Sequence, residues 1–134
     1  MKSFNNIILF YGYSNGNFSI QKLNNNKFEG KIFKLHNSAI NDIKIYNNEN
    51  NEIVYIFTCS EDSSLIISEY NKINDNFNIL INKKIHFSSI KSIIIKQYNI
   101  NIFHFYIKKI NIILIFIFNL NYFNIKLNFF LKIL

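Results

Sequence analysis

The sequence from residue 36 to residue 70 reads HNSAINDIKIYNNENNEIVYIFTCSEDSSLIISEY and contains three strand patterns in a row. In the first, Ala39 to Ile45, apolar side chains alternate with polar ones, as expected of a strand with one buried face. The second, Ile53 to Cys59, is almost continuously apolar and rich in β-branched and aromatic residues, which is typical of a strand buried on both faces. An asparagine-rich break at residues 47–52 separates the two, and asparagine suits tight turns.

A turn and a third strand follow the apolar run. Ser60 to Ser64 is a turn signal, in which the Asp62 side chain can bond to the backbone two residues on. Leu65 to Tyr70 then reads as the third strand. Three short strands joined by tight turns within 35 residues predict an antiparallel meander.

This stretch resembles a WD repeat. The family pattern is a Gly-His pair, a core of variable length, and Ser-x-Asp followed by an apolar pair and Trp-Asp. His36 stands for the family histidine, although Leu35 precedes it in place of glycine, and Ser60 and Asp62 supply the Ser-x-Asp. The apolar pair of the pattern is Leu65 and Ile67.

The resemblance also implies a role for some of these side chains. In the family, the histidine, the serine, the turn aspartate and the tryptophan form a hydrogen-bond network that ties outer strands to inner ones. Here Ser68-Glu69 stands where Trp-Asp is usual. The resemblance therefore implies that His36 and Asp62 keep the central link of the network, and that Ser68 is too short to complete it.

Two further segments repeat parts of the pattern. Residues 12–23 align with residues 59–70 at an offset of 47, and residues 86–93 align with residues 36–43 at an offset of 50. Blades of this class are about 40–50 residues long. The two offsets come from different parts of the pattern, and together they predict successive blades of a β-propeller.

The first residues also read as part of a blade. Met1-Lys2 and the apolar Ile7 to Tyr11 do not make a signal peptide, because the apolar core is short and no small-residue cleavage site follows it. Asn15-Gly16 is a strong two-residue hairpin signal. We expect a loop at Asn24 to Lys31, a short strand at Ile32 to Leu35, and a chain that begins inside a blade.

The pattern continues after the third strand as far as about residue 100. Asn71 to Asn78 reads as a polar connector and Ile79 to Ile85 as a strand. His86 opens the next blade, and residues 90–95 carry its first strand. A hairpin loop is expected at Gln97 to Asn99.

The last residues break the pattern, because residues 101–134 contain no acid, no glycine and no serine. Three interpretations compete for this segment. Ile110 to Ile125 is uncharged and flanked by lysines, but it is shorter than the roughly 20 residues that a membrane-spanning helix needs. The segment could instead supply buried strands that complete the fold. The interpretation we favour is that the segment is out-of-frame or intronic sequence translated in error. In an AT-rich genome, such sequence would yield this set of residues.

The predicted fold is therefore all-β: an incomplete WD-repeat β-propeller of about two blades, built from four-stranded antiparallel meanders. Residues 1–100 form the propeller fragment and residues 101–134 a hydrophobic tail. Propellers have about 4–8 blades of roughly 40–50 residues each, which is more than the 134 residues here supply. We expect a fragment of a longer protein or a fold that another chain completes.

Composition limits the classes of function. The single cysteine, Cys59, cannot form an internal disulfide and favours a reducing compartment, so we expect a cytoplasmic protein. The net charge of +7 comes from lysine alone, and the abundance of lysine, isoleucine and asparagine fits AT-rich codons. Because arginine makes the bidentate phosphate and guanine contacts, its absence weakens the case for nucleic-acid binding.

The candidate catalytic residues have structural explanations. His36, Ser60 and Asp62 have the residue types of a nucleophilic triad, but no glycine-rich elbow surrounds Ser60. Glu61 and Glu69 are turn and strand-end residues rather than an acid–base pair. Asn15-Gly16 is a hairpin rather than a phosphate-binding loop. We therefore predict no catalytic residue and no cofactor.

The candidate metal ligands and the basic cluster also have structural explanations. His86 and His104 with Cys59 are candidate metal ligands, yet the sequence has no Cys-x-x-Cys or His-x-x-x-His pair, so no metal site is predicted. A solvated face is the expected role of the basic cluster near the blade edge, and an RNA contact is the alternative. The cluster consists of Lys83, Lys84, Lys91 and Lys96.

A propeller without catalytic groups usually acts as a rigid platform, so we expect a non-catalytic scaffold that binds other proteins through its propeller faces. This step is an analogy, because a fold alone does not fix a function. Residues 59–65 and 86–93 are also similar to late blades of the WD-repeat subunits that assist a tRNA ribose 2′-O-methyltransferase. That resemblance implies a regulatory partner in tRNA modification. The alternative is a small membrane-anchored protein with a β-rich soluble head and a hydrophobic C-terminal anchor.

Overall fold

The computed structural model describes residues 7–47, 52–84, 89–99, 102–109, 112–119 and 126–133, with side chains as far as residue 93. Within these ranges the regular elements are all strands. They are β1 (Ile8–Gly12), β2 (Asn17–Asn24), β3 (Lys27–Lys34), β4 (Ile40–Asn47), β5 (Ile53–Ser60), β6 (Ser64–Asn71), β7 (Asn76–Lys84), β8 (Ser92–Asn99), β9 (Ile102–Lys109), β10 (Ile112–Asn119) and β11 (Lys126–Ile133).

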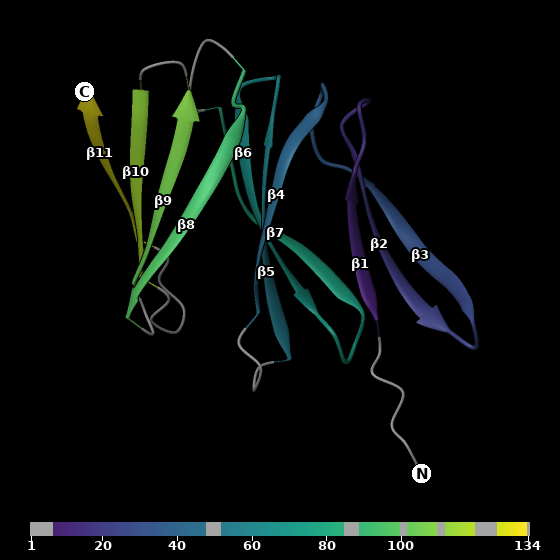
Figure 1. Cartoon of the computed structure of the whole chain (residues 1–134). Coiled ribbons are helices and arrows are strands. Elements are labelled where there is room, and N and C mark those ends of the chain that lie inside the picture. The colour runs from purple at the N-terminus through teal and green to yellow at the C-terminus, as the bar shows by residue number, and fades with distance from the viewer. Residues whose placement is uncertain are drawn as a thin grey trace.

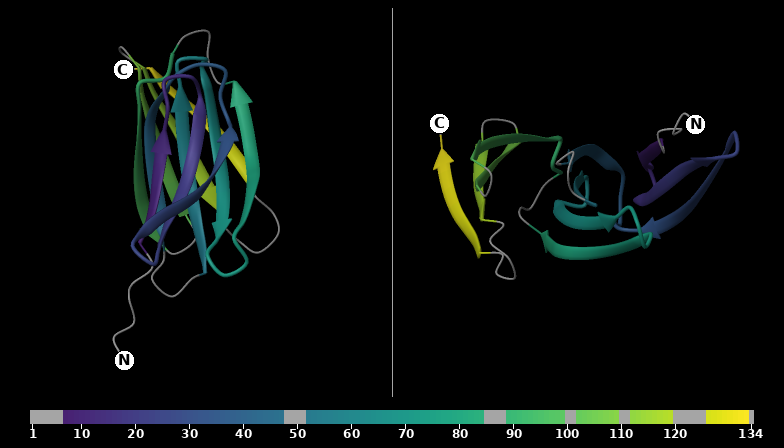
Figure 2. Two further views of the ribbon diagram at one scale, coloured as in Figure 1. Left: turned by 90° about the vertical axis from the view of Figure 1, so that its right-hand side faces the viewer. Right: turned by 90° about the horizontal axis from the view of Figure 1, so that it is seen from below.

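The strands form three separate antiparallel sheets, each joined in sequence order as a meander. The first sheet is β1-β2-β3, the second β4-β5-β6-β7 and the third β8-β9-β10-β11. They stand side by side, with the second sheet between the other two (Figure 1) and the three arranged as an open fan when seen from below (Figure 2). The all-β prediction and the four-stranded meander are confirmed, with three sheets where about two were expected.

The apolar run of β5 explains the position of the second sheet. Alternate residues of a strand point to opposite faces. Val54 and Ile56 face the first sheet, whereas Phe57 and Cys59 point the other way, and all four are buried. The prediction of a strand buried on both faces is confirmed, because sheets pack against it from both sides.

Equivalent turns occur at the predicted offset of 47 residues. Gly16 and Ser63 both have left-handed backbone, with φ of 83° and 69°. The Gly16 N–H donates to the Tyr13 carbonyl (3.0 Å), and the Ser63 N–H donates to the Ser60 carbonyl (3.2 Å). The strands that follow, β2 and β6, begin and end at the same offset.

The second predicted offset, 50 residues, describes how each sheet joins the next. The Ile40 N–H donates to the carbonyl of Tyr13 in the preceding turn (3.2 Å). The Ile90 N–H, 50 residues later, donates to the carbonyl of Ser60 in the next turn (3.0 Å). The same backbone link therefore joins the first sheet to the second and the second to the third.

An apolar core fills the space between the first two sheets. Phe18 and Ile20 of β2 are buried against the β5 and β6 side chains, and an aromatic stack extends the contact. The ring centroids of Phe18 and Phe77 are 5.8 Å apart, and those of Phe33 and Phe77 are 4.3 Å apart. Gly12 allows close approach here, because a Cβ at this position would lie 2.7 Å from the Ile40 Cγ2 atom.

Three sequence predictions of loops were wrong. The hairpin loop expected at Gln97 to Asn99 is the end of strand β8, which extends to Asn99. The other two loops fall in the first two sheets. Most of the Asn24–Lys31 loop is the solvent-exposed strand β3, and the turn that precedes it centres on Asn25 and Asn26, which both have positive φ. The connector at Asn71–Asn78 is likewise shorter than expected, because β7 begins at Asn76. In both places polar side chains on an exposed strand were taken for a loop.

The C-terminal segment forms strands where a helix had been one alternative. Residues 112–119 belong to β10, which pairs with β9 and β11. Among the described residues, no helix of the length and hydrophobicity needed to cross a membrane is present. The strand alternative agrees with the structure, and β8 before residue 100 pairs with β9 after it. The interpretation of residues 101–134 as translated out-of-frame or intronic sequence stays a prediction.

Candidate functional site

His36 is the centre of a buried polar network between the first two sheets. It lies in the segment between β3 and β4, and its side chain is 1% exposed. The Nδ1 atom is 2.6 Å from the Ser64 hydroxyl oxygen, and the Nε2 atom is 2.8 Å from the Thr58 hydroxyl oxygen. Both ring nitrogens are therefore occupied by side chains of the second sheet.

Asp62 completes this network from the turn between β5 and β6. Its Oδ1 atom lies 3.5 Å from His36 Nδ1 and accepts hydrogen bonds from the Ser64 N–H (2.9 Å) and the Ser64 hydroxyl. Its Oδ2 atom accepts from the Asn37 N–H (2.7 Å). The carboxylate thus fixes its own turn and the backbone just after His36, and the central link that the resemblance implied is present.

Ser60 does not have the place in the network that the sequence comparison gave it. The Ser60 hydroxyl donates to the Ser38 carbonyl (3.1 Å) and accepts from the Asp62 N–H (3.1 Å). The hydroxyls that bond to His36 are those of Ser64, at Nδ1, and of Thr58, a fully buried residue, at Nε2. The position of Thr58 in the middle of an apolar strand could have indicated this, because a buried hydroxyl needs a partner.

The electrostatics of the network favour a neutral imidazole. Burial lowers the pKa of His36 from its ordinary value, although the nearby Asp62 carboxylate opposes the shift. Burial alone would raise the pKa of Asp62, but the hydrogen bonds from Ser64 and Asn37 outweigh it and lower the pKa to about 2. At neutral pH the site holds a carboxylate beside an uncharged ring.

Asp62, His36 and Thr58 stand in the order of a catalytic triad, so access decides what they can do. In a triad the base takes a proton from a hydroxyl that reaches the substrate. The Thr58 and His36 side chains are 0% and 1% exposed, respectively. No substrate can reach the hydroxyl without separating the two sheets, so this geometry supports a structural role.

Ser68 stands where the family pattern has tryptophan. It is fully buried, and its hydroxyl has no hydrogen-bond partner among the described residues. The strand register pairs Ile56 with Ser68 and Thr58 with Ile66, so Ser68 shares the face of Thr58 one pair further along. The expectation that this side chain is too short to join the network is confirmed.

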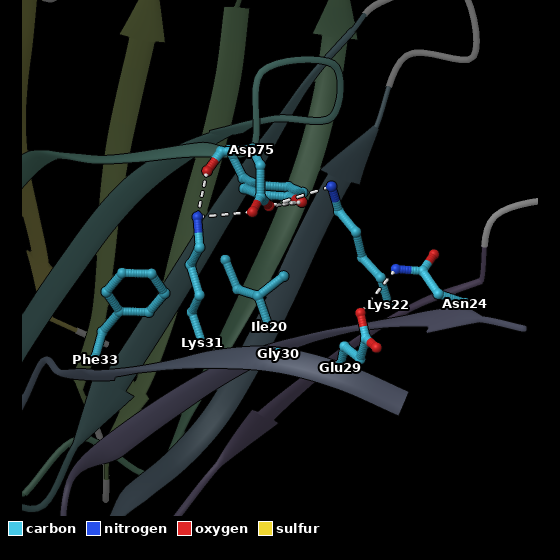
Figure 3. A pocket seen from close by; sticks show the side chains of 9 residues that line it. Ile20, Lys22, Asn24, Glu29, Gly30, Lys31, Phe33 and Asp75 are labelled. Carbon is cyan, nitrogen blue, oxygen red and sulfur yellow. Dashed lines mark hydrogen bonds and ion pairs between the residues drawn. The ribbon is translucent and has the colours of Figure 1, made fainter. Parts of the chain in front are cut away.

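A shallow pocket of about 230 Å³ lies between the first two sheets, at the ends of β2 and β3 (Figure 3). Asp75 is its central group. The carboxylate accepts from Lys31 Nζ (2.7 Å), Lys22 Nζ (3.2 Å) and the Tyr70 hydroxyl (2.7 Å). The pocket is lined by Ile20, Lys22, Asn24, Glu29, Gly30, Lys31, Phe33, Tyr70 and Asp75.

The charges of this pocket are balanced within the chain. Hydrogen bonds from Lys31 and Tyr70 lower the pKa of Asp75 well below its ordinary range. Lys22 also lies over the Tyr70 ring, with its Nζ atom 5.4 Å from the ring centroid. Ligand pockets are usually about 300–1,000 Å³. The smaller volume and the paired charges indicate a clamp between the β2–β3 hairpin and the β6–β7 turn, a contact that the sequence alone did not reveal.

The other candidate catalytic residues stay apart from one another. Glu61 is exposed and bonds to Ser38 (3.3 Å), whereas Glu69 bonds to Asn78 (3.3 Å). Burial raises the pKa of the Cys59 thiol to about 12, which leaves it protonated and unreactive. Asn15-Gly16 is the predicted tight turn.

The described part of the chain contains no candidate metal site. No group of three or more histidine, cysteine or acidic side chains is close enough to hold a metal there. Lys84 and Lys91 both lie at the β5–β6 turn end of the second sheet, with Lys91 Nζ 4.0 Å from Glu61. The side chains of His86, His104 and Lys96, which were also candidates, lie outside the described residues.

Comparison with known proteins does not identify a family for this chain. No protein-family model matches the chain, and no curated protein does so either. The WD-repeat interpretation therefore depends on the repeat offsets and on the link between His36 and Asp62.

The unpaired Ser68 hydroxyl leads to a prediction of increased stability. A buried hydroxyl without a partner costs about 1–3 kcal/mol, so Ser68→Ala should raise the free energy of unfolding by roughly 0.5–1.5 kcal/mol once the small void is allowed for. The matched control, Ser60→Ala, removes two hydrogen bonds and should lower it by about 1 kcal/mol. Urea unfolding followed by circular dichroism measures both. A loss of stability in Ser68→Ala would contradict the unpaired geometry.

The neutral His36 leads to a prediction of pH dependence. Above pH 6.5, the ordinary pKa, the ring is uncharged in both folded and unfolded chains, so its contribution is complete. As the pH falls below 6.5, the unfolded chain binds a proton that the folded one resists, and stability should fall by at most about 1.4 kcal/mol per pH unit. Asp62 acts in a separate window, between pH 3.8 and about 2.

NMR titration of the His36 ring and urea unfolding between pH 5 and 7.5 test this directly. The folded ring should titrate with a midpoint below 6.5. His36→Gln keeps a hydrogen-bonding group without the titration, and it should show a shallower dependence of stability on pH. A midpoint at or above 6.5, or an unchanged slope in the variant, would mean that the ring is not buried as a neutral base.

Proposed function

We propose that this chain is a non-catalytic scaffold of the WD-repeat β-propeller class, which binds other proteins through the surfaces of its sheets. One observation carries the proposal. The side chains with catalytic potential, His36, Thr58 and Asp62, lie inside a sheet-to-sheet junction, where His36 bonds to Thr58 and lies 3.5 Å from the Asp62 carboxylate. They stabilise the arrangement of the sheets and are not presented to a substrate.

The WD-repeat class is proposed on two grounds that are independent of each other. Equivalent turns and backbone links recur at offsets of 47 and 50 residues. The histidine before the first strand of the second sheet lies 3.5 Å from the aspartate of the turn, as the family pattern implies. The chain departs from that pattern at position 68, where serine replaces the tryptophan and its hydroxyl has no hydrogen-bond partner among the described residues.

We further propose that the scaffold assists a tRNA ribose 2′-O-methyltransferase in the cytoplasm. This step comes from the resemblance of residues 59–65 and 86–93 to late blades of such subunits. The lysines at the β5–β6 turn end of the second sheet, with the net charge of +7, would supply attraction to the tRNA backbone. Phosphate contacts of this kind give affinity without sequence specificity.

A charge-reversal experiment tests the tRNA contact. Lys84→Glu/Lys91→Glu changes the charge at the β5–β6 turn end of the second sheet. Lys27→Glu/Lys72→Glu makes the same change at the opposite ends of the first two sheets and serves as the control. The first variant should bind tRNA at least about tenfold more weakly and with a smaller dependence on salt, whereas the control should be affected much less.

Co-purification provides the second arm of the test. The tagged chain should recover a tRNA 2′-O-methyltransferase subunit from cells of its own source. If no methyltransferase subunit is recovered and both double variants bind tRNA alike, the tRNA role is wrong, and the proposal returns to a general protein-binding scaffold.

A further inference from the structure

The sequence contains a single Asn-Gly pair, Asn15-Gly16, and the structure places it in the turn between β1 and β2. Asparagine is a chemically labile residue. It deamidates most readily before glycine, because glycine has no Cβ to hinder attack by its own backbone nitrogen. Asn15 is exposed, so water reaches its side-chain amide. The pair is therefore a candidate site of spontaneous covalent modification.

The reaction needs no partner other than water. The Gly16 backbone nitrogen loses its proton and attacks the Asn15 Cγ atom, and the side-chain nitrogen leaves as ammonia. The product is a cyclic succinimide, which water then opens. Cleavage of the bond to Cγ gives aspartate with the normal backbone. Cleavage of the original peptide bond gives isoaspartate, in which the backbone passes through the side-chain carbons.

The folded turn restrains both reacting groups. The Gly16 N–H donates to the Tyr13 carbonyl (3.0 Å), so the proton that must leave is held in a hydrogen bond. The Asn15 Oδ1 atom accepts from the Asn17 N–H (3.1 Å), which fixes the side-chain amide. Ring closure has to remove the first of these bonds and strain the second. The closed turn should therefore react more slowly than an open one.

Gly16 also anchors the segment that carries His36. Its carbonyl accepts from the Leu35 N–H (3.3 Å) and the His36 N–H (3.1 Å). A Cβ at Gly16 would lie 2.2 Å from the His36 carbonyl oxygen and 2.8 Å from that of Ser38, so the turn lies close against this segment. Isoaspartate adds one carbon atom to the backbone just before Gly16. The turn can accept that atom only if the His36 segment moves.

The second sheet shows which product fits such a turn. At the offset of 47 residues, Asp62 occupies the place of Asn15. Its Oδ1 atom accepts from the Ser64 N–H (2.9 Å), as the Asn15 Oδ1 atom accepts from the Asn17 N–H. Aspartate with a normal backbone therefore suits this position. Isoaspartate does not, because its side chain is shorter and its backbone longer.

We propose that Asn15 is a deamidation site controlled by folding, and that its isoaspartyl product weakens the junction that His36 makes between the first two sheets. The reaction proceeds when the turn opens locally. When opening and closing are fast, the rate of such a reaction follows the equilibrium population of the open form. This modification goes beyond the scaffold role and does not depend on binding of tRNA or of any partner.

Peptide mapping by mass spectrometry of the full chain, incubated in mildly alkaline buffer, tests the control by folding. Conversion of Asn15 should be at least about tenfold slower in the folded chain than in the urea-unfolded chain. His36→Gln loosens the segment that Gly16 anchors and should speed conversion in the folded chain. Lys27→Gln, in the hairpin at the opposite end of β2, is the control and should leave the rate unchanged.

Urea unfolding of the products tests the consequence. Fragmentation that distinguishes isoaspartate from aspartate identifies chains with isoaspartate at position 15, and these should unfold at a lower urea concentration than unmodified chains. Asn15→Asp reproduces the other product and should keep the original midpoint. Equal conversion rates in folded and unfolded chains, faster conversion of another asparagine in the unfolded chain, or isoaspartyl chains as stable as Asn15→Asp would each overturn the proposal.

Discussion

The structure depends on the buried imidazole of His36. One side chain from the segment that leaves the first sheet bonds to Thr58 in β5 and to Ser64 at the start of β6. The Asp62 carboxylate completes the junction by bonding to the Asn37 N–H of the same segment. Since an unpaired buried polar group is costly, these partners make one arrangement of the two sheets much more favourable than its alternatives.

The rest of the interface extends this junction in two directions. Toward the ends of β2 and β3, the aromatic stack on Phe77 and the Asp75 clamp hold the hairpins of the first two sheets together. Toward the third sheet, two backbone N–H groups donate to the second sheet. The Ile90 N–H donates to the Ser60 carbonyl (3.0 Å), and the Ile93 N–H donates to the Asp42 carboxylate (2.9 Å). At each junction, the linking groups of the later sheet lie just before its first strand or at the start of that strand.

Much of this architecture could be predicted because it is local and repeated. The strands β4, β5 and β6 follow from alternation, from the apolar run and from the turn at Asp62, and the two offsets located the equivalent links. The first part of β3, Lys27 to Lys31, was expected to be a loop, because these residues are all exposed and their sequence shows no alternation of buried and exposed side chains. The Lys22–Asp75 contact joins residues 53 apart through the packing of two sheets, and no local pattern encodes it.

The site shows the same division between local and long-range information. The His36–Asp62 pair could be predicted from the family resemblance, but the choice of Thr58 over Ser60 depends on which hydroxyl the strand register brings to the ring. Both residues lie on the same side of β5, and the spacing of residues alone does not distinguish them.

A double-mutant cycle on His36 and Thr58 tests the central claim most directly. The unfolding free energies of His36→Gln, Thr58→Val and the double variant should give a coupling energy of about 1–2 kcal/mol. The parallel cycle with Ser60→Ala should give a smaller value, because Ser60 does not contact the ring. A His36–Thr58 coupling below about 0.5 kcal/mol, with the larger value found for Ser60, would contradict the account that the buried imidazole joins the first sheet to the second.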